Sequence, residues 1–353
     1  MSKYFKINKI KFNNNFTNKL SYMKYLFLLI LILSTLLMIN SSSWYNAWMM
    51  MEINLLSFIP IMLHKSKKNK SSNPMMMYFF VQTSSSSWFI MMLIISNLET
   101  NLIKINIIFT VIQLSLLMKL GASPFHWWMP KILPNLSWMN CFILFTWQKI
   151  GPLILLESLN VNSMTYLSSI LSIYFGAILG MNQTSIKLIM AYSSINHLGW
   201  ILMSLMIETS MLIIYLIVYS SINLMICLMM NSLNFNNLNN LFKNKSNNVN
   251  EMLMMSLFLS LSGMPPLLGF LPKFMLLLMM IKNSLLIETL FFILMSVISL
   301  SFYFNPLMSM LFFSKFNLKF NYKNFFFNKT LSSILMINLS LSLFVSSHLM
   351  NLL

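Results

Sequence analysis

Long apolar segments recur along the whole chain, and they constrain its fold more than any other feature. A transmembrane helix needs about 20 mainly apolar residues. A window of that length predicts an all-α polytopic membrane protein with about 11 transmembrane helices. The predicted spans are residues 23–40, 42–63, 75–95, 103–123, 136–157, 162–180, 185–206, 210–233, 252–281, 284–313 and 330–350.

Composition supports this class and excludes others. Hydrophobic residues make up 58% of the chain and charged residues only 8%, whereas soluble domains carry about 25% charged residues. Cys141 and Cys227 lie inside apolar segments without a CxxC or Cys/His pattern, so the sequence indicates neither a metal site nor a disulfide framework. No phosphate-binding glycine motif occurs, which argues against a nucleotide site.

The lysines are distributed unevenly across the predicted membrane. The formal net charge is +17, and all 23 basic residues are lysines. If successive loops alternate sides, 18 lysines lie on the side of the N-terminus, two (Lys104 and Lys282) lie opposite, and three fall inside spans. This positive-inside pattern predicts an N-terminus on the cytoplasm-equivalent side and a C-terminus across the membrane. It explains the charge without a nucleic-acid partner. Residues 1–22 are predicted to form a basic tail, and residues 23–350 the membrane domain.

Four ionisable side chains are predicted to lie inside the membrane: Glu52, Lys119, Lys149 and Lys273. A charge at the bilayer centre costs at least about 2.5–3.5 kcal/mol, and burial favours the neutral form of either residue type. Such groups can exchange protons with one another, so they predict a proton-translocation path. The alternative is structural, with each charge held in an ion pair or hydrogen bond that fixes helix packing.

Two of these lysines adjoin predicted helix breaks. The segment KLGASPF contains Lys119, and SGMPPLLGFLPK ends at Lys273. Broken helices at corresponding places in two halves are typical of transport sites. The lysines are five spans apart, an odd number, which predicts two inverted five-helix repeats plus one extra C-terminal helix. The breaks are expected at Gly121, Pro124, Gly263, Pro265 and Pro266.

Two histidines are candidates for an extension of the path. His126 lies in SPFHWW and His197 in SSINHLGW. Histidine titrates near neutral pH, although a lone membrane histidine also serves as a packing hydrogen-bond partner. Gln148 and Asn196 stand in apolar surroundings as groups that can hold water.

Several motifs together resemble a known family. The segments WMMMEINLLSFIP, KLGASPFHWWMP, LSWMNCFILFTWQKIGP, MNQTSIKLIMAYSSINHLGW and SGMPPLLGFLPKF are similar, in that order, to segments of NADH dehydrogenase subunit 2. That family comprises antiporter-like, mitochondrially encoded subunits of respiratory complex I. The resemblance runs from about residue 23 to the C-terminus, and the composition resembles that of an insect or related mitochondrial genome.

The resemblance implies a function and a set of residue roles. It implies a proton-translocating subunit of the mitochondrial inner membrane, with its N-terminus in the matrix. Glu52 and Lys119 match the glutamate–lysine pair of the first half, Lys149 the connecting lysine, and Lys273 the lysine of the second broken helix. No cofactor is expected in this chain, since NADH, FMN, iron–sulfur clusters and ubiquinone would belong to the assembled complex. Expected partners are other membrane subunits, including antiporter-like ones, and lipids such as cardiolipin.

Two other functions fit the same charges. A stand-alone cation/proton antiporter would act without partner subunits. A structural membrane scaffold would use the buried charges only for packing. Replacement of Lys149 by methionine distinguishes a relay, which would lose pumping, from a scaffold, which would lose assembly or nothing.

Overall fold

The computed structural model describes residues 22–63, 72–99, 102–159, 163–233, 248–265 and 267–316, and the side chains of residues 63, 72–73, 102–103, 233, 248–252 and 309–316 are not part of that description. Within these ranges the chain is helical, without β-strands. The helices are Tyr22–Ile39, α2 (Trp44–Leu63), α3 (Ser72–Leu98), α4 (Leu102–Leu120), η1 (Phe125–Trp127), α5 (Trp128–Ile132), η2 (Leu133–Asn135), α6 (Trp138–Phe145), α7 (Trp147–Ser158), α8 (Ser163–Met181), α9 (Ile186–Ile207), α10 (Thr209–Leu233), α12 (Asn248–Ser262), α13 (Phe270–Lys282) and α14 (Leu286–Phe316).

Helix is present in every predicted span from 23–40 to 284–313. Eight helical segments of the described chain are long and apolar enough to cross a membrane. The predicted span 252–281 consists of two shorter helices, α12 and α13. The predicted span 330–350 and all but the last residue of the basic tail, residue 22, lie outside the described residues.

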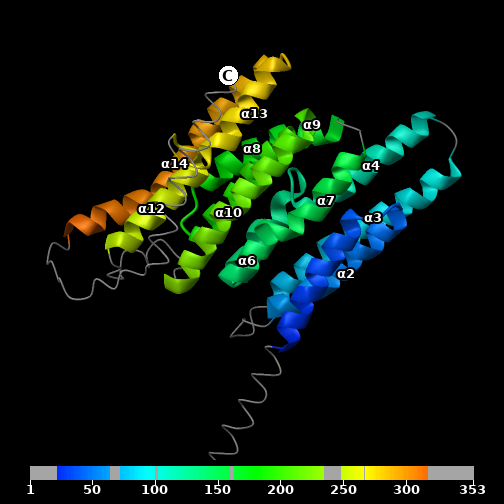
Figure 1. The fold of residues 1–353 in the computed structure, drawn as a ribbon, viewed down its shortest axis with the longest axis horizontal. Coiled ribbons are helices and arrows are strands. Elements are labelled where there is room, and N and C mark those ends of the chain that lie inside the picture. The colour runs from blue at the N-terminus through cyan, green and yellow to red at the C-terminus, as the bar shows by residue number, and fades with distance from the viewer. Residues whose placement is uncertain are drawn as a thin grey trace, which may run out of the picture.

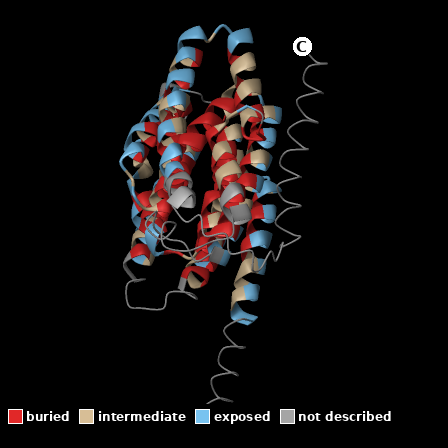
Figure 2. Ribbon diagram, turned by 90° about the vertical axis from the view of Figure 1, so that its left-hand side faces the viewer, coloured by how far each residue is buried: buried red, intermediate tan, exposed pale blue. Residues whose placement is uncertain are grey.

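The helices lie side by side in a bundle (Figure 1), with α2 and α3 at one end, α12 and α14 at the other, and α6 to α10 between them. Buried residues concentrate in the middle of the bundle, and exposed residues face outward (Figure 2). Large apolar side chains are exposed on this outer surface, among them Phe80, Trp88, Ile217, Ile287 and Leu294. Soluble monomers rarely expose so much apolar surface, whereas lipid accommodates it without cost.

The centre of the bundle is α9, the most buried of the candidate spans. Because lipid is as apolar as the side chains, helices in a membrane associate through close packing and hydrogen bonds. Gly176 of α8 allows this approach, since a Cβ there would lie 2.7 Å from the backbone nitrogen of Asn196. Gly199 of α9 faces Ser169 and Ser172 of α8 in the same way.

Both breaks adjoin a glycine with positive φ. Helix α4 ends at Leu120, and Gly121 has φ 71°. Helix α12 ends at Ser262, and Gly263 has φ 83°. Only glycine adopts this conformation without strain, so each glycine allows the chain to leave its helix. Pro124 follows the first break and Pro265 the second, while Pro266 lies outside the described residues.

A third interruption was not predicted from the sequence. The span 136–157 was expected to be continuous, but it divides into α6 and α7 at Thr146. The Thr146 hydroxyl donates to the Phe142 carbonyl at 2.8 Å, a local bond that competes with regular helical pairing. Pro152, which lacks an N–H, lies inside α7. The interruption places Lys149 in the first turn of α7.

Candidate functional site

Three lysines lie buried inside the bundle. Lys119 on α4, Lys149 on α7 and Lys273 on α13 are 7%, 2% and 5% exposed. Among the described residues the one ion pair is Lys104 with Glu99, and it lies at the exposed surface. None of the three buried lysines forms an ion pair with a described carboxylate, so the structural alternative would rest on hydrogen bonds. Their ammonium groups contact carbonyl oxygens, sulfur and aromatic rings instead.

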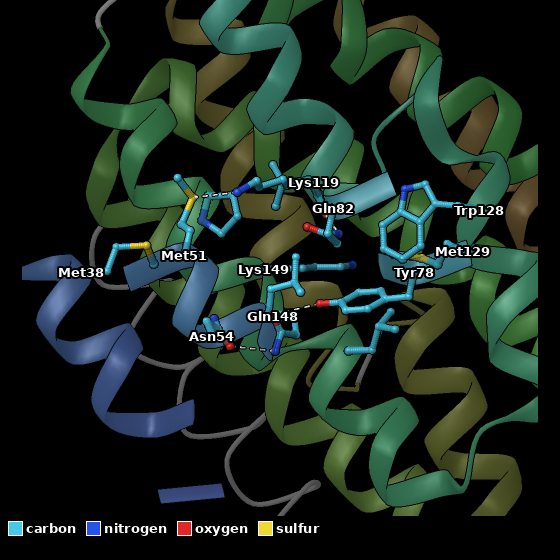
Figure 3. Close-up of a pocket in the computed structure, with 14 residues that line it drawn as sticks. Met38, Met51, Asn54, Tyr78, Gln82, Lys119, Trp128, Met129, Gln148 and Lys149 are labelled. Carbon is cyan, nitrogen blue, oxygen red and sulfur yellow. Dashed lines mark hydrogen bonds between the residues drawn. The ribbon is translucent and has the colours of Figure 1, made fainter. Parts of the chain in front are cut away.

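Lys119 points toward α2. Its Nζ lies 3.5 Å from the Met51 sulfur, and Figure 3 shows the two side chains pointing toward each other. The next residue, Glu52, interacts electrostatically with Lys119 but does not reach it as an ion pair. Glu52 is half-buried, and its Oε1 has no hydrogen-bond partner among the described residues. The predicted glutamate–lysine pair is thus close in space without direct contact.

Lys119 and Lys149 line the same small cavity (Figure 3). Its volume is about 30 Å³, and a water molecule needs about 10–15 Å³. Polar groups line it: Gln148 Nε2 donates to Asn54 Oδ1 at 3.0 Å, and Tyr78 lies 3.5 Å from Gln148 Oε1. The cavity therefore has both the room and the polar groups that a water molecule requires.

Lys149 reaches from the cavity into the centre of the bundle. Its Nζ donates to the Ser194 carbonyl of α9 at 3.1 Å. The same ammonium lies 5.2 Å from the centre of the Tyr219 ring on α10, a cation–π distance. Neither partner carries a charge, so the position of Lys149 does not depend on a carboxylate.

His197 is buried on α9, close enough to the second and third lysines to interact electrostatically with both Lys149 and Lys273. Its Nδ1 lies 2.9 Å from the Tyr215 hydroxyl, and its ring centre lies 5.0 Å from that of Tyr219. The structure therefore joins His197 to the row of lysines.

Lys273 binds the helix end that the second break creates. Its Nζ donates to the Ser262 carbonyl at 2.8 Å and approaches the Leu261 carbonyl at 3.4 Å. The last carbonyls of a helix have no partner within the helix, and they carry partial negative charge. The ammonium also lies 5.8 Å from the Trp200 ring centre. The break thus provides an uncharged site for a cation.

His126 and Lys187 lie apart from the row formed by Lys119, Lys149 and Lys273. His126 is only partly buried; its Nδ1 lies 3.1 Å from Ser123 Oγ and its ring stacks on Phe175. Lys187, one of the 18 lysines counted on the side of the N-terminus, is 8% exposed. Its Nζ donates to the carbonyls of Pro134 and Leu136 at 3.1 and 2.6 Å. Its position at the start of a predicted span gave no sign of this buried role.

The described residues offer no metal site. No three His, Cys, Asp or Glu side chains come together within them. Both cysteines are buried and unpaired.

Comparisons with known proteins agree with this architecture. A family profile described as "NADH:quinone oxidoreductase/Mrp antiporter, TM" matches residues 41–299. The NADH-ubiquinone oxidoreductase chain 2 of Anopheles gambiae is 39% identical over 77% of this chain and 80% of its own length. This chain belongs to the NADH-ubiquinone oxidoreductase chain 2 family. Other members are 35% identical in Locusta migratoria, covering 80% of this chain and 83% of that relative, and 34% identical in Lumbricus terrestris, covering 79% and 84%.

Solved structures share the fold at low sequence identity. A chain of respiratory complex I from Thermus thermophilus has a TM-score of 0.75 at 18% identity, covering 82% of this chain and 70% of that chain. A chain of the archaeal membrane-bound sulfane sulfur reductase gives 0.76 at 17%, covering 91% and 73%. A chain of the Mrp complex from Dietzia sp. DQ12-45-1b gives 0.72 at 13%, covering 80% and 60%. The antiporter-like membrane fold is common to all three.

Proposed function

We propose that this chain is a core membrane subunit of the proton-pumping NADH:ubiquinone oxidoreductase, and that its buried lysines carry protons. The observation that supports this most directly is the row of Lys119, Lys149 and Lys273, none of which has a carboxylate partner within 4.0 Å in the described chain. A buried lysine without a fixed counter-ion can exist with or without its extra proton. Glu52, near Lys119, supplies the acidic end of the row.

Neighbouring groups can pass a charge along this row. The cavity between Lys119 and Lys149 has room for water, and His197 interacts with the charges of Lys149 and Lys273. A change of protonation at one group alters the energy of the charged form at the next. Electron transfer in other subunits would shift the charges near Glu52 and Lys119. These two residues would pass the shift on to Lys149 and then to Lys273.

The proposal extends to topology and surroundings. It includes eleven spans in two inverted five-helix repeats with one extra helix, residues 1–22 as a matrix-side tail, and residues 23–350 as the membrane domain. The protein would lie in the mitochondrial inner membrane, with its C-terminus toward the intermembrane space. It would act as a translocase subunit without its own redox centre. Its partners would be other complex I membrane subunits and lipids such as cardiolipin, without nucleic acid.

Substitution of Lys149 by methionine tests this function. We expect the complex to assemble and to lose NADH-driven proton pumping into vesicles, because methionine occupies similar volume without a titratable group. The exposed Lys104, substituted in the same way, serves as the control. Normal pumping by an assembled Lys149→Met complex would rule out the relay, and loss of assembly alone would favour the scaffold.

The alternative of a stand-alone antiporter has one observation in its favour, the structural likeness to the Mrp chain. Purification from native membranes distinguishes a complex I subunit from a stand-alone antiporter. A complex I subunit should co-purify with other complex I subunits. A free antiporter should purify alone and retain cation/proton exchange when reconstituted.

A further inference from the structure

Both broken helices end in the same hydrogen-bonding motif. At the end of α4, the Gly121 N–H donates to the Met118 carbonyl at 3.2 Å, and the Ala122 N–H donates to the Leu117 carbonyl at 3.1 Å. This is the Schellman arrangement, in which a glycine with positive φ closes the helix. The last four carbonyls of a helix lack intrahelical partners, and the motif satisfies only the first two of them.

The end of α12 repeats the motif and shows what can bind the remaining carbonyls. The N–H groups of Gly263 and Met264 donate to the carbonyls of Ser260 and Leu259 at 3.1 and 3.3 Å. The Lys273 ammonium then reaches the last two carbonyls of the helix, at 2.8 and 3.4 Å. A lysine from beyond the break thus completes the second helix end.

A glutamine takes this place at the first helix end. Gln82 is buried on α3, and its Nε2 donates at 3.2 Å to the Lys119 carbonyl, one of the last two carbonyls of α4. Trp128 of α5 adds a second donor, since its Nε1 lies 3.2 Å from the Met118 carbonyl. Both donors are uncharged. Neutral side chains rather than an ammonium group therefore complete the first break.

This difference matters for Lys119, whose side chain belongs to the same helix end. The last carbonyls of a helix carry partial negative charge, and a lysine near the C-terminus of a helix can bind them. The Lys119 ammonium instead lies 3.5 Å from the Met51 sulfur on α2, which is only a weak acceptor. Gln82 lines the same cavity as Lys119 (Figure 3). Its amide occupies the carbonyl that would otherwise compete for the ammonium.

We propose that Gln82 is a positioning residue for Lys119. By binding the Lys119 carbonyl, the glutamine amide keeps the Lys119 ammonium from that site and leaves it directed toward Met51 and the adjacent Glu52. A charged donor at this position would repel the ammonium, whereas an amide does not. The inference rests on the proposed function, in which Lys119 carries protons, and it concerns a residue outside the row of lysines.

Gln82→Met in the intact complex tests this role, because methionine has a similar volume but cannot donate a hydrogen bond. We expect NADH-driven pumping per assembled complex to fall about two- to tenfold, the change that corresponds to one hydrogen bond. A cryo-EM map of this variant should show the Lys119 ammonium at the end of α4 rather than beside Met51. Gln183→Met is the matched control and should pump normally, because Gln183 also donates to a last-turn carbonyl, that of Leu179 at 3.0 Å, but at the exposed surface.

Gln82→Glu supplies a readout that a packing role would not affect. The new carboxyl group can donate to the Lys119 carbonyl only when it is protonated, and when ionised it would bind the ammonium instead. Relative to the unsubstituted complex at the same pH, pumping by Gln82→Glu should therefore rise as the pH is lowered. Gln82→Met should show no such recovery. Equally low pumping by the two variants at every pH would contradict the role of the amide donor.

Failure of this inference can be distinguished from failure of the proposed function. Normal pumping per complex by Gln82→Met, alongside loss in Lys149→Met, would overturn the role of Gln82 and leave the proton path in place. Normal pumping by Lys149→Met would overturn the path and the role of Gln82 with it. A map of Gln82→Met in which the ammonium stays beside Met51 would also refute the role. If Gln82→Met does not assemble, low pumping by Gln82→Glu that does not change with pH would overturn it.

Discussion

The Lys273 ammonium donates a hydrogen bond to the Ser262 carbonyl, 2.8 Å away across the break between α12 and α13. A Cβ on Gly263 would lie 2.9 Å from the Lys273 Cδ, so the glycine makes room for this side chain. The break and the lysine thus depend on each other. The broken helix supplies free carbonyls, and the lysine satisfies them in a place that water does not readily reach.

Lys273→Met should therefore affect both stability and transport. The substitution leaves the Ser262 carbonyl without its partner, which costs about 1–3 kcal/mol, and it removes a titratable group. We expect lower thermal stability of the purified complex and loss of pumping. Lys282→Met, at an exposed position in the last turn of the same helix, should change neither measurement.

Glu52→Ala and Lys119→Ala should lower NADH-driven pumping while the complex still assembles. The two groups interact across a gap rather than through an ion pair. Removal of one side chain therefore does not break a direct contact of the other. Proton uptake in vesicles and native gels would measure the two effects. Glu99→Ala, which breaks an exposed ion pair, is the matched control. Unchanged pumping in both the Glu52→Ala and the Lys119→Ala complex would show that these two residues are not part of the proton path.

Lys187→Met should separate a structural lysine from the relay lysines. Lys187 holds two carbonyls beyond the first broken helix, and its loss should destabilise the protein by about 2–3 kcal/mol. The complex that does assemble should pump normally per molecule. Lys131→Met, at an exposed position over the Trp127 ring, should leave stability unchanged. A pumping defect in fully assembled Lys187→Met complex would place this lysine in the path.

Gly176→Ala should weaken the pairing of α8 with α9. The added methyl would lie 2.7 Å from backbone of α9, which cannot move without shifting the helix, and overpacking of this kind costs about 1–3 kcal/mol. Gly151→Ala would instead meet the flexible end of Met38 and should cost less. The amount of assembled complex after mild heating would compare the two. Equal losses would show that α8 and α9 do not pack as tightly as the structure indicates.

The sequence alone determined the class of protein, the positions of most helices and the identity of three of the buried lysines. These properties are local. A run of apolar residues is long enough to span a bilayer wherever it occurs, and a lysine in the middle of such a run is buried whichever helix lies beside it. The glycines at the two main breaks were also evident, because positive φ is a property of a single residue.

Only the tertiary structure decided which groups meet. It placed Met51 rather than Glu52 against Lys119, joined His197 but not His126 to the row, and buried Lys187 at an interior helix end. Each of these contacts joins residues far apart in the chain. Their formation depends on how each helix is rotated and packed against its neighbours, and helix periodicity in a uniformly apolar segment carries little information about that rotation.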